Sequence, residues 1–233
     1  MEDAKRRIPA HAGLGRMLEI GIAPREGAAF NLLCLGAHSD DIEIGCGGTV
    51  LRLIEEIPGL HVQWVVFGAA GARGSEALAS ANTMLANART KEVTIKEFRD
   101  GFFPHSGAAL KESFEELKRG AVPDLILTHY RNDLHQDHRL VSELTWNTFR
   151  DHLILEYEIV KYDGDLGTPN FYVQLSDALC QQKVRHLMDH FGSQRSKRWF
   201  TEDTFLAMLR LRGVECNANG RYAEAFYGRK LRH

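Results

Sequence analysis

Apolar segments typical of strands alternate with amphipathic segments typical of helices along most of this chain. Strands are expected at residues 30–37, 61–67, 93–98, 124–129, 156–162 and 171–175. Helices are expected at residues 47–57, 75–91, 108–119, 138–150, 176–191 and 201–211. This alternation is typical of βαβ units, in which helices cover both faces of parallel strands. The pattern predicts a Rossmann-like, three-layer α/β/α fold with a mainly parallel sheet.

The length and composition fit one domain with a substantial core. The chain has 233 residues, of which 44% are hydrophobic and 26% are charged. We interpret residues 30–233 as a single domain and residues 1–29 as an N-terminal arm. The formal net charge of -2 gives no general attraction to nucleic acid or to an anionic membrane surface. We therefore expect a small-molecule partner and no nucleic acid.

The sequence also gives expectations about the compartment of the protein. No stretch has the apolar core of a signal peptide or approaches the roughly 20 apolar residues of a membrane span. The four cysteines show no C-x-x-C spacing, which is typical of reduced thiols in the cytosol. We expect a cytoplasmic protein with no membrane span and no disulfide framework.

Two short polar motifs follow predicted strands. The first is Ala-His-Ser-Asp-Asp at residues 37–41, and the second is His-Gln-Asp-His at residues 135–138. Ligands of open parallel sheets bind beyond the carboxyl ends of the strands. Right-handed crossovers can bring strands that are distant in sequence next to each other. We therefore expect the two motifs to meet at one edge of the sheet.

Histidine and carboxylate in this pattern suit a catalytic metal ion. A catalytic zinc ion usually has three protein ligands and an open position for water, whose pKa falls toward ~7. We interpret His38, Asp41 and His138 as the three ligands. Asp40 then has no metal bond to make, so its carboxylate is the candidate general base.

The remaining residues of the second motif have candidate supporting roles. His135 would stabilise the developing oxyanion or protonate the leaving amine. Asp137 would orient a histidine through its second ring nitrogen. The expected cofactor is Zn²⁺, and Fe²⁺ is possible because two histidines and one carboxylate suit both ions.

The paired motifs resemble those of the PIG-L/LmbE-like family of zinc-dependent N-deacetylases, in its bacterial type. Residues 37–49 are similar to the first motif of the family with its Gly-rich helix start, and residues 123–138 are similar to the second. Ser39 and Ile42 depart from the proline and glutamate common in the family, but neither change removes a ligand or the base. The resemblance covers roughly residues 30–228. It implies a hydrolase that removes the N-acetyl group of an amino sugar, such as N-acetylglucosamine, or of a sugar-like small molecule.

The resemblance implies further candidate residues near the substrate. Arg99 and Asp100 follow the third predicted strand, and Glu224 lies in a motif that is similar to one near the C-terminus of bacterial members. His129 joins this set because it ends the strand before the second motif. For Arg99 and Asp100 the competing interpretation is a surface ion pair, and for Glu224 it is structural packing. For His129 a supporting role behind the site and a plain strand-end histidine are equally favoured. The resemblance also favours a homo-oligomer.

Two other classes remain open. The same His/Asp/His set is found in non-haem iron enzymes. A non-catalytic nucleotide-binding module would explain the α/β pattern and the glycines at residues 45–48. These glycines do not match G-x-G-x-x-G, however, and close packing at the start of a helix is the favoured interpretation. His186 and His190 have a metal-chelating spacing, but no glutamate follows His186, so we expect them to be exposed or packed. The basic run at residues 195–199 is expected to be a solvated helix start, with a phosphate contact as the minor option.

Overall fold

The fold is described here from a computed structural model, which describes residues 19–22, 29–120 and 122–231. Most of the predicted N-terminal arm, residues 1–29, lies outside these ranges. The boundary between arm and domain therefore stays a prediction. Within the described ranges, no helix is long and apolar enough to cross a membrane.

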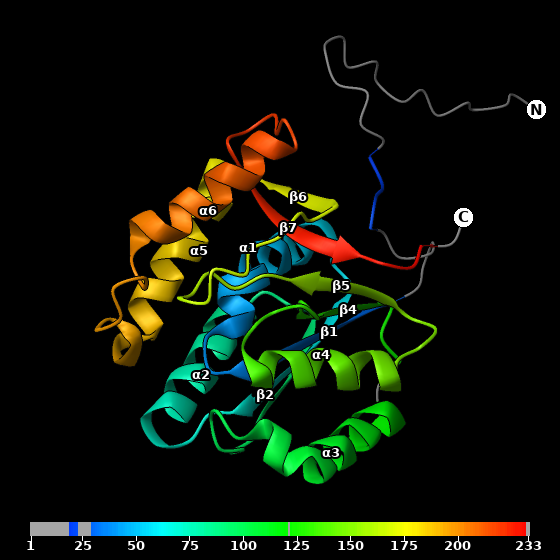
Figure 1. Cartoon of the computed structure of the whole chain (residues 1–233). Coiled ribbons are helices and arrows are strands. Elements are labelled where there is room, and N and C mark those ends of the chain that lie inside the picture. The colour runs from blue at the N-terminus through cyan, green and yellow to red at the C-terminus, as the bar shows by residue number, and fades with distance from the viewer. Residues whose placement is uncertain (1–18, 23–28, 121, 232–233) are drawn as a thin grey trace, which may run out of the picture.

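A seven-stranded sheet forms the middle layer of the protein (Figure 1), with the strand order β3-β2-β1-β4-β5-β7-β6. The strands are β1 (Phe30–His38), β2 (Leu60–Gly68), β3 (Thr90–Ile95), β4 (Leu125–His129), β5 (Leu153–Tyr157), β6 (Phe171–Leu175) and β7 (Tyr222–Gly228). The first five strands pair in parallel, and β7 pairs antiparallel with both β5 and β6. The predicted three-layer fold with a mainly parallel sheet is confirmed.

Helices cover both faces of this sheet. They are α1 (Asp41–Glu56), α2 (Gly71–Met84), α3 (Gly107–Gly120), α4 (Gln136–Thr148), α5 (Asp177–His190) and α6 (Glu202–Glu215), with short 3₁₀ turns at Phe103–Ser106 and Gly192–Gln194. Successive residues of β1 enter different cores: Leu32 and Cys34 pack on the α1, α2 and α5 side, and Leu33 and Leu35 on the α3 and α4 side. Burial on both faces explains why the central strands are almost continuously apolar. All four cysteines are buried and unpaired.

Two strands lie several residues from their predicted positions. We expected β3 at residues 93–98, but it ends at Ile95, because Glu97 then forms an antiparallel bridge with Gly68. We expected β5 at residues 156–162, but its pairing with β4 begins at Leu153. Hydrophobicity alone does not show where a neighbouring strand stops pairing. The short strand β7 was not predicted as a strand at all.

The Gly-rich stretch lies inside α1, which begins at Asp41 and not at residue 47 as expected. A Cβ on Gly45 would lie only 2.1 Å from Cδ2 of Tyr157, and one on Gly48 only 2.5 Å from Cδ1 of Leu175. Glycine at these positions therefore lets α1 approach β5 and β6 closely. These contacts favour helix packing over a phosphate-binding turn.

The sheet order determines where the two motifs lie. Strand β1 pairs with β4, and each strand ends next to one motif. Residues 38–41 lead from β1 into α1, and residues 130–135 lead from β4 into α4. Both motifs therefore lie at the same edge of the sheet, as predicted.

Replacing Gly45 by alanine should destabilise the protein, because the Tyr157 ring beside it is fully buried and cannot move away. We expect a loss of about 1–3 kcal/mol in the free energy of unfolding, measured by urea denaturation. Gly107→Ala is the matched control, since this helical glycine has no atom near its Cβ position. Equal stability of the two variants would contradict the packing role of Gly45.

Candidate metal centre

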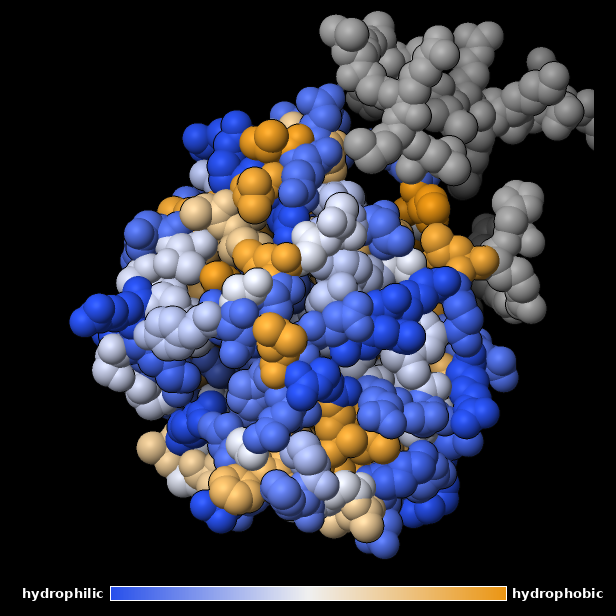
Figure 2. Space-filling view, in the orientation of Figure 1, coloured by the Kyte–Doolittle hydropathy of each residue, from blue (hydrophilic) through white to orange (hydrophobic). Residues whose placement is uncertain are grey.

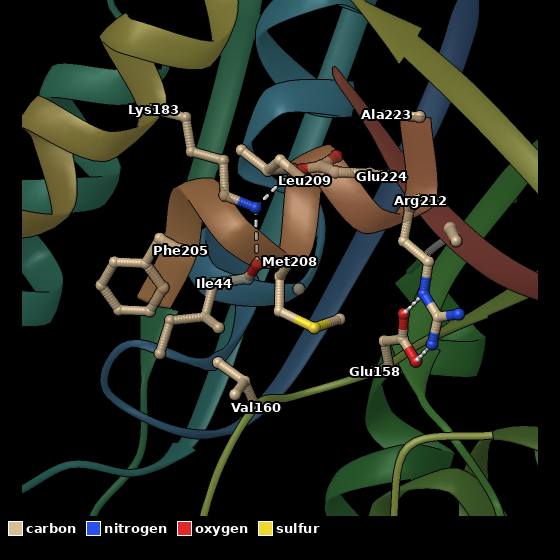
Figure 3. A pocket seen from close by; sticks show the side chains of 12 residues that line it. Ile44, Glu158, Val160, Lys183, Phe205, Met208, Leu209, Arg212, Ala223 and Glu224 are labelled. Atoms are coloured by element: carbon tan, nitrogen blue, oxygen red, sulfur yellow. Dashed lines mark hydrogen bonds and ion pairs between the residues drawn. The ribbon is translucent and has the colours of Figure 1, made fainter. Parts of the chain in front are cut away.

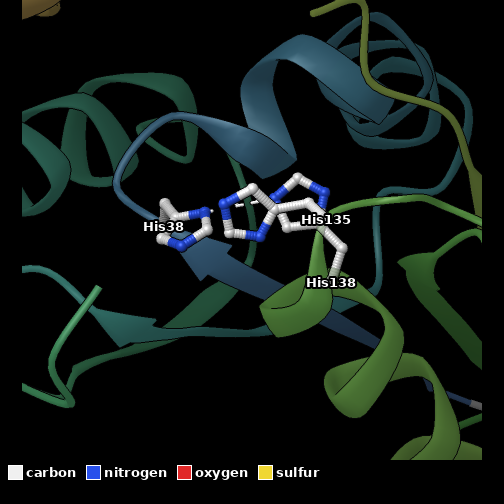
Figure 4. A group of neighbouring side chains, drawn as sticks. All are labelled: His38, His135 and His138. Atoms are coloured by element: carbon white, nitrogen blue, oxygen red, sulfur yellow. Dashed lines mark hydrogen bonds between the residues drawn. The ribbon is translucent and has the colours of Figure 1, made fainter. Parts of the chain in front are cut away.

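Three side-chain atoms converge where the two motifs meet. Nδ1 of His38 lies 3.1 Å from Nε2 of His138 and 3.3 Å from Oδ2 of Asp41. The third pair, Nε2 of His138 and Oδ2 of Asp41, is 3.5 Å apart. Donor atoms that share one tetrahedral zinc ion at about 2.1 Å are roughly 3.4 Å apart. The three donor atoms therefore fit a single metal ion in both type and spacing. Figure 4 shows the two rings with that of His135 beside them.

The other ring nitrogen of His38 faces carboxylates. Its Nε2 lies 3.1 Å from Oδ2 of Asp137 and 3.1 Å from Oδ1 of Asp100. Asp137 is fully buried and also accepts hydrogen bonds from the amides of Gly101 and Phe103, at 2.6 and 3.1 Å. A proton on Nε2 would satisfy these carboxylates and leave the Nδ1 lone pair free for a metal ion. Asp137 therefore has the contact expected of a carboxylate that orients a ligand.

His138 has a corresponding carboxylate that the sequence analysis missed. Its Nδ1 lies 3.0 Å from Oδ2 of Asp133, which is also buried. Asp133 is held in turn by Lys161, whose Nζ lies 3.0 Å from the same oxygen, and Lys161 also pairs with Asp165. The sequence signal that could have identified Asp133 is its position in the loop that precedes the second motif. Lys161 lies in a connection with no recognisable pattern, so nothing in the sequence pointed to it.

Asp40 is buried, and its carboxyl accepts a hydrogen bond from the hydroxyl of the neighbouring Ser39 at 3.4 Å. Burial raises the pKa of its carboxyl to about 6, and the neighbouring charge of Asp41 adds to this rise. The positive charges of Arg73 and Lys197 oppose it. Arg73, from α2, donates to Oγ of Ser39 at 3.3 Å. A carboxylate whose pKa lies near neutrality suits proton transfer.

His135 is the partly exposed histidine of the cluster. Its ring centroid lies 4.8 Å from that of His38 and 4.5 Å from that of His138 (Figure 4). His135 precedes the first residue of α4, and its Nδ1 accepts a hydrogen bond from the amide of Asp137 at 3.2 Å. This bond fixes the ring and leaves Nε2 as the atom available to a bound molecule.

The structure places Asp100 beside the cluster, with Oδ1 3.1 Å from Nε2 of His38, and leaves Arg99 exposed next to it in the sequence. Asp100 is half-exposed and, besides its contact with His38, accepts a hydrogen bond from Arg73 at 2.6 Å. Arg99 does not pair with Asp100 but lies over the ring of Phe102, with Cζ 3.6 Å from the ring centroid. Asp100 and Arg99 thus have different neighbours, and the surface ion pair between them does not form.

His129 is fully buried, with its ring stacked on that of His138 at a centroid distance of 4.0 Å. Its Nε2 accepts a hydrogen bond from the amide of Ala37 at 2.9 Å, although it also lies 3.3 Å from Oδ2 of Asp41. The amide uses the lone pair that a metal ion or a substrate would need. The contacts of His129 are therefore those of a residue that supports the site from within.

Glu224 lies behind α1 and its carboxylate is fully engaged. It accepts hydrogen bonds from the amides of Gly48 and Thr49 and pairs with Lys183 at 2.6 Å. This ion pair lines a pocket between α1, α5, α6 and β7, with about 380 Å³ of space that is partly open to solvent (Figure 3). A second ion pair, Arg212 with Glu158, lies at the other end of the pocket (Figure 3). These bonds leave no free oxygen on Glu224 for a substrate.

His186 and His190 are not part of the cluster. Their rings stack on each other at 4.1 Å, and Nε2 of His186 lies 2.8 Å from Oγ of Ser80. Nδ1 of His190 lies 3.0 Å from the backbone oxygen of His186. These partners bear out the packed interpretation of the pair.

The electrostatic environment favours a positive charge at the centre of the cluster. Burial alone would lower the pKa of His38. The carboxylates of Asp41, Asp100 and Asp137 outweigh burial and raise this pKa well above its usual value. In contrast, burial lowers the pKa of His138 to about 3, so its lone pair is available at neutral pH. A cation bound between the two rings would satisfy the same carboxylates.

The fold and this cluster define an α/β protein with a candidate metal centre at the carboxyl ends of its parallel strands. The family model PIG-L, described as GlcNAc-PI de-N-acetylase, matches residues 33–149, half of the chain and both motifs. The chain belongs to the PIG-L family. The resemblance inferred from the motifs is thereby confirmed.

Solved structures share this fold. An N,N'-diacetylchitobiose deacetylase from Pyrococcus horikoshii matches with a TM-score of 0.66 and 21% identity over 86% of this chain and 84% of that one. A conserved protein from Thermus thermophilus matches with a TM-score of 0.68 and 21% identity over 88% and 97% of the two chains. A deacetylase of the A40926 pseudoaglycone matches with a TM-score of 0.66 and 18% identity over 84% and 96%. At these identities the likeness establishes the fold alone.

Asp137→Asn should loosen the loop at Gly101 and Phe103, because an amide nitrogen would replace one of the two oxygens that accept their N–H groups. We expect faster hydrogen exchange at these two amides and a loss of about 1–3 kcal/mol in the free energy of unfolding. Asp151→Asn, at an exposed position, is the control. Unchanged protection of both amides would show that Asp137 does not hold this loop.

Proposed function

We propose that this protein is a metal-dependent hydrolase that removes the N-acetyl group from an amino sugar or a sugar-like small molecule. The observation that carries the proposal is the convergence of His38 Nδ1, Asp41 Oδ2 and His138 Nε2 within 3.1–3.5 Å of one another. Membership in a family whose model is described as a de-N-acetylase supports N-deacetylation as the type of reaction. The diacetylchitobiose deacetylase with the same fold supports a sugar-like substrate.

His38, Asp41 and His138 would hold the metal ion, and zinc is the ion that this ligand set suits best, with ferrous iron as the alternative. When bound, the ion would polarise the acetamide carbonyl and lower the pKa of a water molecule. The protein contributes the orientation of both rings, through Asp137 on His38 and Asp133 on His138. Such carboxylate partners fix the tautomer of a ligand and make it more basic.

Asp40 would act as the general base. Its carboxylate is buried next to Asp41, and its raised pKa matches the task of taking a proton from water near neutral pH. As the C–N bond of the acetamide breaks, the proton is returned to the leaving nitrogen by Asp40 or His135. The products are acetate and a free amine.

His135 would stabilise the negative charge that develops on the carbonyl oxygen. It is the partly exposed ring of the cluster, and its Nδ1 already accepts the Asp137 amide. The opposite nitrogen, Nε2, is then the protonated one and can donate to this oxygen. Asp100, half-exposed beside His38, would accept hydrogen bonds from sugar hydroxyls.

His138→Ala should lose the bound metal ion, because two ligands do not retain zinc or iron as three do. We expect about one zinc or iron ion per wild-type chain and almost none in the variant, by elemental analysis of proteins purified without added metal. His61→Ala, at the start of β2 and therefore at the opposite edge of the sheet, should keep wild-type content. A wild-type protein that neither contains nor takes up metal would exclude this mechanism and favour a nucleotide-binding module. Activity that depends on both iron and oxygen would favour the non-haem iron alternative.

Asp40→Asn should keep the metal ion and lose most of its turnover, since asparagine cannot accept the proton. We expect a decrease of about 10²–10⁴-fold in the rate of amine release from N-acetylated sugars. Metal content, measured on the same preparation, is the control for an intact site. Turnover near the wild-type rate would remove Asp40 from the role of base.

A further inference from the structure

The connection between β5 and β6, residues 158–170, contacts the loop that precedes α4. Figure 1 shows it as the yellow-green trace between these two strands. Oδ2 of Asp165 accepts a hydrogen bond from the amide of Leu134 at 2.7 Å. Nζ of Lys161 lies 3.0 Å from Oδ2 of Asp133 and also pairs with Asp165. The connection therefore holds two successive residues of the loop, directly before the second motif.

The charges at this contact are buried. Hydrophilic residues cover much of the face shown in Figure 2, but ion pairs on such a surface contribute little. The side chains of Lys161, Asp133 and Asp165, in contrast, are only 9%, 2% and 6% exposed. Asp163 lies 3.9 Å from Nζ of Lys161 but is itself exposed. Among the residues that the structure describes, Lys161 is the only lysine or arginine within ion-pair distance of the Asp133 carboxylate.

A residue of α6 holds this connection near both of its ends. Nε of Arg212 lies 2.6 Å from Oε1 of Glu158 at the start of the connection (Figure 3). Nη2 of Arg212 donates to the backbone oxygen of Gly167, near the other end, at 3.3 Å. A Cβ on Gly167 would lie only 2.5 Å from the hydroxyl oxygen of Tyr227, so the backbone packs closely there as well. The position of Lys161 is therefore supported by more than its own ion pairs.

Resting on the proposed function, we propose that Lys161 is a positioning residue, which acts through Asp133 to hold the ring of His138 in the orientation that a metal ligand needs. One oxygen of Asp133 accepts a hydrogen bond from the amide of His135 at 2.7 Å, and the other lies 3.0 Å from Nδ1 of His138. A buried carboxylate requires a compensating partner, and Lys161 supplies it at the second oxygen. With the ring proton on Nδ1, the lone pair of Nε2 is left for a metal ion.

The orientation of the ring can be tested without a metal ion or a substrate. Nitrogen-15 NMR of histidine-labelled, metal-free protein reports which ring nitrogen of His138 carries the proton. We expect the Nδ1–H form in the wild type and a mixture of both forms in Lys161→Met, because the oxygen of Asp133 is then no longer held against the ring. Lys161→Gln, which retains an N–H donor but not the charge, provides the same test if Lys161→Met does not fold.

Lys161→Met should also bind zinc about 10- to 100-fold more weakly, measured by competition with a chelating dye, because losing a partner that orients a ligand has effects of this size. In an Asp133→Asn background the same change should have no further effect, since the carboxylate through which Lys161 acts is gone. Lys183→Met is the matched control. Lys183 is a buried lysine whose partners, Glu224 and the backbone oxygen of Ile44, include no proposed ligand. This variant should keep the wild-type zinc affinity and the wild-type form of His138.

An unchanged His138 ring in Lys161→Met, or wild-type zinc affinity in that variant, would overturn this inference. An equal loss of zinc affinity in Lys183→Met would overturn it too, by showing a general effect of losing a buried ion pair. Failure of the proposed function gives a different result. A wild type that binds zinc but hydrolyses no N-acetyl sugar refutes the reaction, and the zinc affinities still test Lys161. A wild type that binds no metal ion refutes the metal centre, and the protonated nitrogen of His138 then decides alone whether Lys161 orients the ring.

Discussion

Buried negative charge at the end of β1 is the constraint on which the rest of this site depends. Asp40, Asp41, Asp133 and Asp137 are all almost completely buried within two short segments. A carboxylate removed from water is tolerated only if it is paired or hydrogen-bonded. The structure meets this need with backbone amides, with histidine rings and with Lys161. Nδ1 of His38 and Nε2 of His138 both lie next to Oδ2 of Asp41. A divalent cation bound between these three atoms would balance the remaining buried negative charge.

The parallel sheet is what makes such an arrangement possible. Strands β1 and β4 are neighbours although about 90 residues separate them, so both motifs lie at one edge. The close approach of α1 to Tyr157 then fixes the first turn of that helix. Tyr157 in turn donates to the backbone oxygen of Leu35 within β1. The rigid elements thus set the positions of His38, Asp41 and His138.

Much of the site could be predicted from the sequence, because the residues that meet at the centre belong to two compact motifs after apolar strands. No role in the site could be assigned to Asp133, Arg73 or Lys161 from the sequence. Their roles depend on which loop folds over which strand end. For Glu224 the resemblance implied a substrate contact, but tertiary contacts with Gly48, Thr49 and Lys183, which the sequence does not reveal, engage both of its oxygens. The ends of β3 and β5 were predicted wrongly. Pairing with the neighbouring strand determines where each of them begins and ends, and the hydrophobicity of a segment carries no information about this pairing.

The ion pair between Lys161 and Asp133 links the connection from β5 to β6 with the loop that precedes α4. Lys161 and Asp165 lie in the connection from β5 to β6, and Asp165 also accepts the amide of Leu134, next to Asp133. Surface connections of this kind are where related enzymes diversify and where engineers exchange segments. Here an exchanged segment would also change the carboxylate that orients His138. A graft of this connection that omits Lys161 would therefore leave the buried Asp133 without its cation and disturb the position of His138.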